Sequence, residues 1–199
     1  MNERLEQNVG SERTTNITRQ DLIKKLSDAG IDPSIWGQGK AKTVEDLLQE
    51  VNDGEIELIS TPDGTLVRKV PVVTVDVMYT DALGRHYKLV ESRQVFTDGR
   101  ERHRDRNTSV AEKLKVGENV AEAALRGVQE ELGISGEIQL TEDGREITEL
   151  DSPSFPDLRS QYEIFKFSAE LTPGQYKPEG YIERQPDKST YFEWEEVKE

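Results

Sequence analysis

A helical pattern near the middle of the chain brings together side chains that suit metal and phosphate chemistry. Arg126, Glu130 and Glu131 lie on the polar side of a segment whose apolar positions repeat at helical spacing. The two adjacent glutamates fall in the last turn before Gly133, where the helix dipole disfavours negative charge. Departures of this kind from local structural preferences cluster at functional sites. The alternative is a pair of solvated glutamates in a chain that is rich in glutamate.

The segment from Glu112 to Ile134 resembles the Nudix box, G-x5-E-x7-R-E-U-x-E-E-x-G-U, where U is a bulky aliphatic residue. Seven of the nine fixed positions agree, namely Glu118, Arg126, Val128, Glu130, Glu131, Gly133 and Ile134. The resemblance to the Nudix hydrolase superfamily implies binding and hydrolysis of a nucleoside diphosphate linked to another moiety. It also implies Mg²⁺ (or Mn²⁺) as the cofactor, since hard divalent cations take oxygen ligands and bridge to phosphates.

The resemblance gives each matching residue an expected role. Glu130 and Glu131 become metal ligands, and Arg126 orients a carboxylate, with Glu118 at the start of the helix as its partner. Glu130, Glu131, Arg126 and Glu118 together form the expected catalytic set. Glu112, placed in the loop upstream of the helix, is a candidate substitute for a missing metal ligand.

Two positions depart from the box. Glu112 replaces its opening glycine, and Gly127 replaces the glutamate that follows the arginine. At about 100° per residue, positions 127, 130 and 131 share one helix face, so this change removes one of three facing carboxylates. Glycine also weakens a helix by roughly 1 kcal/mol relative to alanine, which indicates that something other than helix stability favours Gly127.

A row of arginines precedes the box. The residues at 100, 102, 104 and 106 alternate, so a strand over Arg100–Arg106 would project all four from one face. Such a face predicts a phosphate-binding surface for the substrate, formed by Arg100, Arg102, Arg104 and Arg106 and joined by Arg93. The equally weighted alternative is an exposed strand whose arginines pair with acidic neighbours such as Glu91.

Three functional hypotheses follow. In the first, a Nudix-like hydrolase domain binds and hydrolyses its substrate, as a weak or atypical enzyme because of Gly127. In the second, given similar weight, a catalytically silent Nudix-homology domain senses a phosphorylated ligand or docks a protein partner. The third and least favoured is a structural module in which the acidic face is incidental.

Periodicity predicts an α+β fold in which a Nudix-like mixed sheet carries the box helix, as an α/β/α sandwich, behind a small helical hairpin. Residues 1–15 are polar and predicted to be disordered, residues 16–54 form the helical hairpin, and residues 55–199 form the Nudix-like domain. The expected strands and the helix of this domain are Glu55–Ser60, Leu66–Val70, Val72–Tyr79, His86–Phe96, Asn119–Leu132 (helix), Ile134–Leu140, Tyr162–Ala169, Tyr181–Arg184 and Tyr191–Val197. The polar stretches Thr141–Ser160 and Leu171–Gly180 are expected to be loops.

Composition narrows the choice of partners. The 199 residues carry 26 Lys and Arg against 40 Asp and Glu, a net charge of −14, which disfavours general binding of nucleic acids or anionic membranes. The chain has no cysteine and no apolar run long enough to span a bilayer. We therefore expect a soluble, cytoplasmic protein that binds a phosphorylated, nucleotide-type small molecule. A homodimer, or a protein partner on the N-terminal hairpin, is left open.

Overall fold

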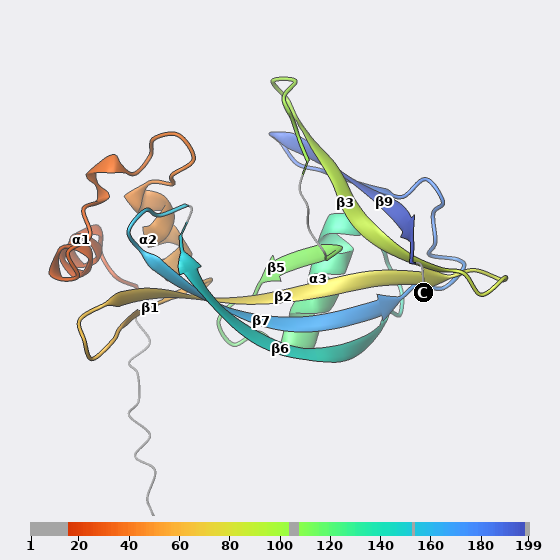
Figure 1. The fold of residues 1–199 in the computed structure, drawn as a ribbon, viewed down its shortest axis with the longest axis horizontal. Helices are drawn as coiled ribbons and strands as arrows, with labels where there is room; N and C mark the ends of the chain where they lie inside the picture. The colour runs from red at the N-terminus through yellow and green to blue at the C-terminus, as the bar shows by residue number, and fades with distance from the viewer. Residues whose placement is uncertain (1–15, 104–107, 153, 198–199) are drawn as a thin grey trace, which may run out of the picture. The chain divides into compact units, whose positions relative to one another are not determined.

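The computed structural model describes residues 16–103, 108–152 and 154–197. They form two compact units that share long strands (Figure 1). The first unit contains the described residues up to Val70 together with 149–161. The second contains the described residues of Pro71–Thr148 and Tyr162–Glu199. The predicted tail at residues 1–15 lies outside the described residues.

The first unit begins with the predicted helical hairpin. Helix α1 (Arg19–Asp28) starts at a capping box between Thr18 and Asp21, and helix α2 (Val44–Asn52) starts at a second one between Thr43 and Asp46. In each box the threonine side chain accepts a hydrogen bond from the aspartate N–H, while the aspartate side chain accepts one from the threonine N–H. A short 3₁₀ helix, η1 (Pro33–Ile35), lies between the two helices.

The rest of this unit supplies the surface on which the helices pack. Strand β1 (Glu57–Ser60) pairs antiparallel with the beginning of β2 (Leu66–Thr80). The ring of Trp36 packs on that of Phe155 with centroids 5.2 Å apart, and its indole N–H donates to the Pro156 carbonyl at 3.1 Å. Trp36 therefore fixes the connection between α1 and α2 to the segment around residue 155.

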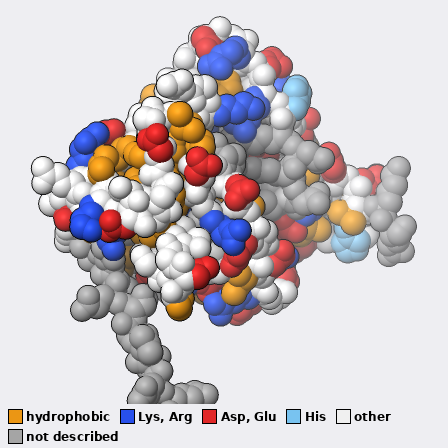
Figure 2. Space-filling view, turned by 60° about the vertical axis from the view of Figure 1, so that its left-hand side comes forward, with side chains coloured by type: hydrophobic (Ala, Val, Ile, Leu, Met, Phe, Trp, Pro, Cys, Tyr) orange, Lys and Arg blue, Asp and Glu red, His pale blue; other side chains and the backbone are white. Residues whose placement is uncertain are grey.

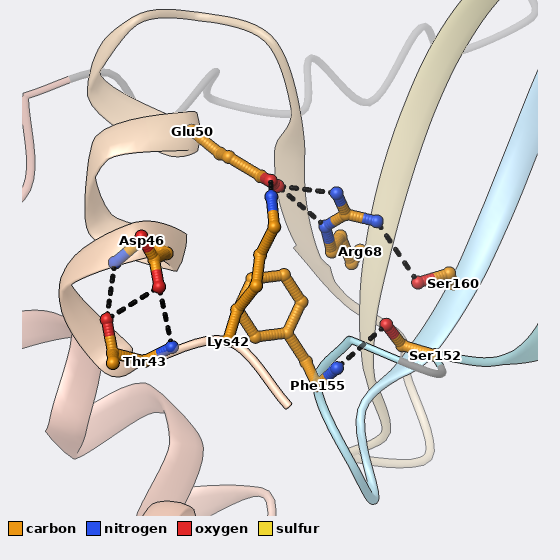
Figure 3. A network of polar contacts seen from close by, with 8 residues as sticks. All are labelled: Lys42, Thr43, Asp46, Glu50, Arg68, Ser152, Phe155 and Ser160. Atoms are coloured by element: carbon orange, nitrogen blue, oxygen red, sulfur yellow. Dashed lines mark hydrogen bonds and ion pairs between the residues drawn. The ribbon is translucent and has the colours of Figure 1, made fainter. Parts of the chain in front are cut away.

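A buried ionic network also holds the first unit together (Figure 3). The carboxylate of Glu50 on α2 accepts hydrogen bonds from Arg68 of β2 at 2.5 and 3.2 Å and from Lys42 Nζ at 2.7 Å. Arg68 donates further to Ser160 Oγ at 3.4 Å and stacks over Phe155. A helix and a strand thus meet at one carboxylate, and Arg68 links them to the segment at 149–161.

The second unit is a sheet that carries the box helix. The sheet has the strand order β6-β7-β2-β3-β9-β8, with β5 on β2 and β4 on β3. The strands not yet introduced are β3 (His86–Phe96), β4 (Glu101–Arg102), β5 (Val110–Lys113), β6 (Gln139–Asp151), β7 (Arg159–Glu170), β8 (Tyr181–Arg184) and β9 (Lys188–Glu196). Helix α3 (Val120–Leu132) follows β5 and is the predicted box helix.

The core of the second unit lies between α3 and the sheet. Ala123, Ala124 and Val128 of the helix are fully buried with Val75 and Val77 of β2. Their small volume lets the helix approach the sheet closely. The predicted α+β class, with the box helix on a sheet and a helical hairpin before it, is confirmed.

Two element assignments predicted after the box helix are wrong. The stretch Thr141–Ser160 was expected to be a loop, but β6 runs through Asp151 and β7 begins at Arg159. The residues at 134–138, expected to be in a strand, precede β6. Strand β6 stands at the end of the strand order, and most of its side chains are exposed, so it lacks the apolar alternation that marks a half-buried strand.

One face of the molecule shows a mixture of charges. On the face shown in Figure 2, lysine and arginine side chains lie among aspartates and glutamates rather than in one basic patch. None of the described helices is both long and apolar enough to cross a membrane.

Candidate functional site

Helix α3 begins and ends where the sequence predicts. The side chain of Asn119 accepts a hydrogen bond from the Ala121 N–H at 2.9 Å and caps the N-terminus. Gly133 ends the helix in the left-handed conformation, with φ of 62°. These two caps fix which residues of the box face the sheet and which face outward.

Arg126 is the centre of the site, and its main partner is Glu118, as the sequence predicts. Its Nε donates to Glu118 Oε1 at 2.8 Å, and its Nη2 donates to Glu118 Oε2 at 3.0 Å. Nη2 also donates to the Lys113 carbonyl at 3.0 Å. A planar guanidinium held by this fork has one orientation.

The pairing shifts the pKa of both groups. The hydrogen bonds from Arg126 lower the pKa of Glu118, assisted by the Lys115 N–H, while partial burial acts in the opposite direction. The hydrogen bonds to Glu118 raise the pKa of Arg126, and the nearby charge of Glu112 adds to this effect. Both groups are therefore charged throughout the neutral range.

Arg126 also reaches two of the three predicted metal ligands. Its Nη1 lies 3.4 Å from Glu112 Oε1 and 3.5 Å from Glu130 Oε2. Glu130 is more than half exposed, whereas the Glu112 side chain is about three-quarters buried. One guanidinium thus stands among three carboxylates that come from strand β5, the loop before the helix, and the helix itself.

Glu112 and Glu130 line a cavity of about 310 Å³ in the second unit. Its walls carry five glutamates against a single lysine, together with two glutamines, a threonine and an alanine. The lining residues are Glu91, Gln94, Ala111, Glu112, Glu130, Glu131, Glu183, Gln185, Lys188 and Thr190. The predicted metal ligands Glu112, Glu130 and Glu131 are all among them. The cavity therefore concentrates negative charge, which favours a cation or a cation-bound ligand.

Glu112 lies in a strand, and its expected place in a loop is wrong. It belongs to β5, where it stands opposite Val73 of β2 in an antiparallel ladder. Strand β5 packs directly against α3. The position in a ladder gives Glu112 a fixed backbone, which a loop residue would not have.

The same packing explains Gly127. A Cβ atom on Gly127 would lie 3.0 Å from Val110 Cγ1 and 3.2 Å from Glu112 Cβ. The helix can approach β5 this closely only because residue 127 has no side chain. The Glu112 side chain therefore occupies space next to the backbone where a side chain at position 127 would begin.

The donor chemistry of the cavity fits Mg²⁺ or Mn²⁺, since carboxylate oxygens are the ligands that these ions take. Within the described residues, however, no three acidic or histidine side chains are already grouped as a metal site. Glu112 and Glu130 instead face Arg126. The residues match the cation in type, and binding requires these two side chains to turn toward it.

The arginine row is only partly a strand. The shared face requires a strand over Arg100–Arg106, and within the described residues this condition is met only at β4, Glu101–Arg102. Arg104 and Arg106 lie outside the described residues. Arg100 pairs with Asp98 at 2.6 Å, and Arg93 lies 3.4 Å from Glu193 and over the ring of Tyr191. Arg93, Arg100 and Arg102 do not line the cavity, but Arg102 stands opposite Gln94, which does.

Six polar or charged residues of the cavity wall are not indicated by any local sequence pattern, and two of them, Glu91 and Gln94, depend on a β-bulge. The register between β3 and β9 shifts between Glu91 and Arg93. In a regular strand Glu91 and Gln94, three residues apart, would face opposite sides of the sheet. The extra residue puts both of them on the cavity side, with 6% and 3% of their surfaces exposed. Glu183, Gln185, Lys188 and Thr190 come from β8, β9 and their connection, which the chain brings in from far along the sequence.

Among the comparisons with known proteins, only the one with solved structures finds matches. No family model matches the chain, and no curated protein matches it. The Ap4A hydrolase of C. elegans is 16% identical, covering 63% of this chain and 79% of its own, with a TM-score of 0.37. A Listeria monocytogenes protein assigned to the NUDIX hydrolases is 18% identical over 64% of this chain and 76% of its own, with a TM-score of 0.40. The third, RenU of M. smegmatis, is 13% identical over 70% of this chain and 79% of its own, with a TM-score of 0.36.

Of these three, the Listeria monocytogenes protein and RenU are described as Nudix hydrolases. This is also the family that the segment Glu112–Ile134 resembles.

Proposed function

We propose that the second unit binds a nucleoside diphosphate linked to another moiety, together with Mg²⁺ or Mn²⁺, and hydrolyses it. The observation that carries this proposal is the convergence of Glu112, Glu130 and Glu131 on one cavity whose walls hold five carboxylates. Carboxylate oxygens are the ligands that hard divalent cations take, so a diphosphate bound to such a cation suits this lining.

Each residue of the box has a role in this proposal. Glu112, Glu130 and Glu131 would hold the cation, which supplies charge stabilisation to the diphosphate and lowers the pKa of a bound water. Glu118 fixes Arg126 by two hydrogen bonds, and Arg126 in turn contacts Glu112 and Glu130, from which they would turn to the cation. Glu118 and Arg126 are thus positioning residues.

Glu112 takes the part of the carboxylate that Gly127 lacks. Its Cβ lies 3.2 Å from the point where a Cβ of residue 127 would stand, so its carboxylate starts from nearly the same place. The acidic ligand is then delivered by a strand rather than by the helix.

The arginines would contribute unequally to the binding of substrate phosphates. Arg102 is the favoured contact because β4 pairs with β3 at Gln94, a residue of the cavity wall. Arg93 and Arg100 already pair with carboxylates and so have less charge to offer.

A silent, ligand-sensing domain is the second candidate, and one observation favours it. Arg126 lies within 3.5 Å of both Glu112 and Glu130, so it neutralises part of the charge that a cation would need. In that case the cavity binds a phosphorylated ligand or a partner without turning it over.

The test is hydrolysis of a panel of nucleoside diphosphate compounds, with Mg²⁺ or Mn²⁺ and with chelator. We expect metal-dependent turnover that Glu130→Gln lowers by about 10²-fold or more, since it removes a metal ligand. Glu122→Gln is the matched control, because Glu122 is an exposed glutamate of the same helix outside the cavity wall and should leave turnover unchanged.

Turnover that does not depend on Glu130 would place the chemistry elsewhere. A folded protein with no turnover above the Glu130→Gln background would favour the silent domain over the enzyme.

A further inference from the structure

Among the buried polar groups of the cavity that the box does not account for is the side-chain amide of Gln94. Gln94 lies on β3 just after the bulge and is 3% exposed. Its Nε2 donates to Thr190 Oγ1 at 3.5 Å, a long contact. Within the described residues, no donor reaches Gln94 Oε1. Buried polar atoms without a partner are rare in folded proteins, because such an atom loses its hydrogen bonds to water and gains nothing in return.

The surroundings of Gln94 indicate what could satisfy this oxygen. Of the ten residues that line the cavity, nine are polar or charged and Ala111 alone is apolar. A nucleobase binds on aromatic or aliphatic walls, which this lining lacks, so the cavity suits the diphosphate and a hydroxyl-bearing group attached to it. Near a set of carboxylates, a neutral amide oxygen is also the weakest ligand for a cation.

We infer that Gln94, together with Thr190, is a specificity-determining pair that accepts a hydrogen bond from a hydroxyl of the moiety linked to the diphosphate. The inference rests on the proposed function, since it assigns the selectivity of the same cavity. The bulge at residue 92 supports it, because without this bulge the Gln94 side chain would face away from Glu91 and the cavity.

The inference has a consequence for stability that a purely structural glutamine would not have. Methionine has a similar volume and no carbonyl oxygen, so Gln94→Met removes the unsatisfied acceptor while it keeps the packing. We expect Gln94→Met to raise the Tm by about 2–4 °C, as for other sites where binding groups are held at the expense of stability.

The binding test compares two probes in the presence of Ca²⁺, a hard cation that takes the same oxygen ligands as Mg²⁺. ADP-ribose carries free hydroxyls on the linked sugar, and the β-methyl ester of ADP has none there. By isothermal titration, we expect the wild-type protein to bind ADP-ribose about tenfold more tightly, and Gln94→Met to bring the ratio of the two Kd values close to one. Gln129→Met, an exposed glutamine of α3 outside the cavity wall, is the matched control and should keep the wild-type ratio.

The remaining outcomes overturn the inference. A wild-type ratio near one, a ratio that Gln94→Met leaves unchanged, or no binding of either probe would each show that Gln94 does not read the linked moiety. The proposed function fails by a different measurement, namely the absence of Glu130-dependent hydrolysis across the panel, so the two failures are distinguishable.

Discussion

Two clusters of charged side chains, one in each unit, differ in how their charge is balanced. In the first unit, Glu50 faces two cations, Arg68 and Lys42, and both partners of the inner pair are almost fully buried. In the cavity of the second unit, five carboxylates face Lys188 and the neighbouring Arg126. The first cluster sets two cations around one carboxylate, whereas the described lining of the second holds five acidic residues and one lysine.

This difference separates a structural role from a binding role. A buried charge with all its partners fixes the elements that carry those partners and leaves nothing for a ligand. A cavity lined mainly by acidic residues offers oxygen ligands to a cation, and departures of this kind from ordinary packing are found mainly at functional sites. Substitutions in each of the two clusters test this contrast.

The largest expected effect belongs to the balanced cluster. Glu50→Ala leaves Arg68 buried without its carboxylate, and we expect the free energy of unfolding to fall by about 3–5 kcal/mol in urea titrations. Asp28→Ala, which breaks only the exposed pair with Lys24, is the control and should change little. The double change Glu50→Leu with Arg68→Met should recover most of the loss, because it removes both charges together. A loss in Glu50→Ala no greater than in the control would contradict a structural role for this cluster.

A smaller effect is expected at the edge of the cavity. Glu118→Gln weakens the two hydrogen bonds to Arg126, and we expect a loss of about 1–2 kcal/mol at pH 7. Because folding lowers the pKa of Glu118 below its ordinary value of 4.5, its contribution is present above that value and is lost as pH falls through the folded pKa. The stability difference between wild type and Glu118→Gln should therefore shrink as the pH drops below about 4.

Unfolding titrations of both proteins between pH 3 and 7 measure this trend. A difference that stays constant over the acid range would mean that the Glu118 charge does not stabilise the fold.

The smallest effect is expected at Gly127, where two terms oppose each other. Alanine favours the helix by about 1 kcal/mol, while its Cβ crowds Val110 and Glu112 at a cost of about 1–3 kcal/mol. We expect Gly127→Ala to lower the unfolding free energy by about 1 kcal/mol. For the same steric reason, Gly127→Glu should lower both stability and metal-dependent turnover rather than restore a carboxylate. Increased turnover in Gly127→Glu would show that β5 can move away from the helix.

Local patterns in the sequence predict much of the fold. The predicted bounds of His86–Phe96 and Tyr181–Arg184 agree with β3 and β8, and the helix Asn119–Leu132 differs from α3 only at its cap. Strong periodicity and clear end signals account for this agreement. The two strands predicted on either side of Pro71, Leu66–Val70 and Val72–Tyr79, form a single strand. Strand β2 runs through that proline from Leu66 to Thr80.

The site was harder to predict than the fold. Spacing along one helix is enough to place Arg126, Glu130 and Glu131 close together. It also indicates Glu118, eight residues before Arg126, as the partner of the arginine. The approach of β5, which explains both Gly127 and Glu112, is a tertiary contact that no local pattern encodes. The same holds for Gln94, whose direction depends on a bulge in the pairing of two strands about a hundred residues apart.

The first unit is built from two pieces of chain that are far apart in sequence, and this has a consequence for its biosynthesis. Phe155, which packs on Trp36 and under Arg68, and Ser160, which accepts from Arg68, belong to the second piece. A ribosome delivers residues 71–148 between the two pieces, so a nascent chain cannot complete this core until residue 161 has emerged. Chains truncated near residue 148 should therefore be sensitive to proteases throughout their N-terminal part, even though both capped helices are present.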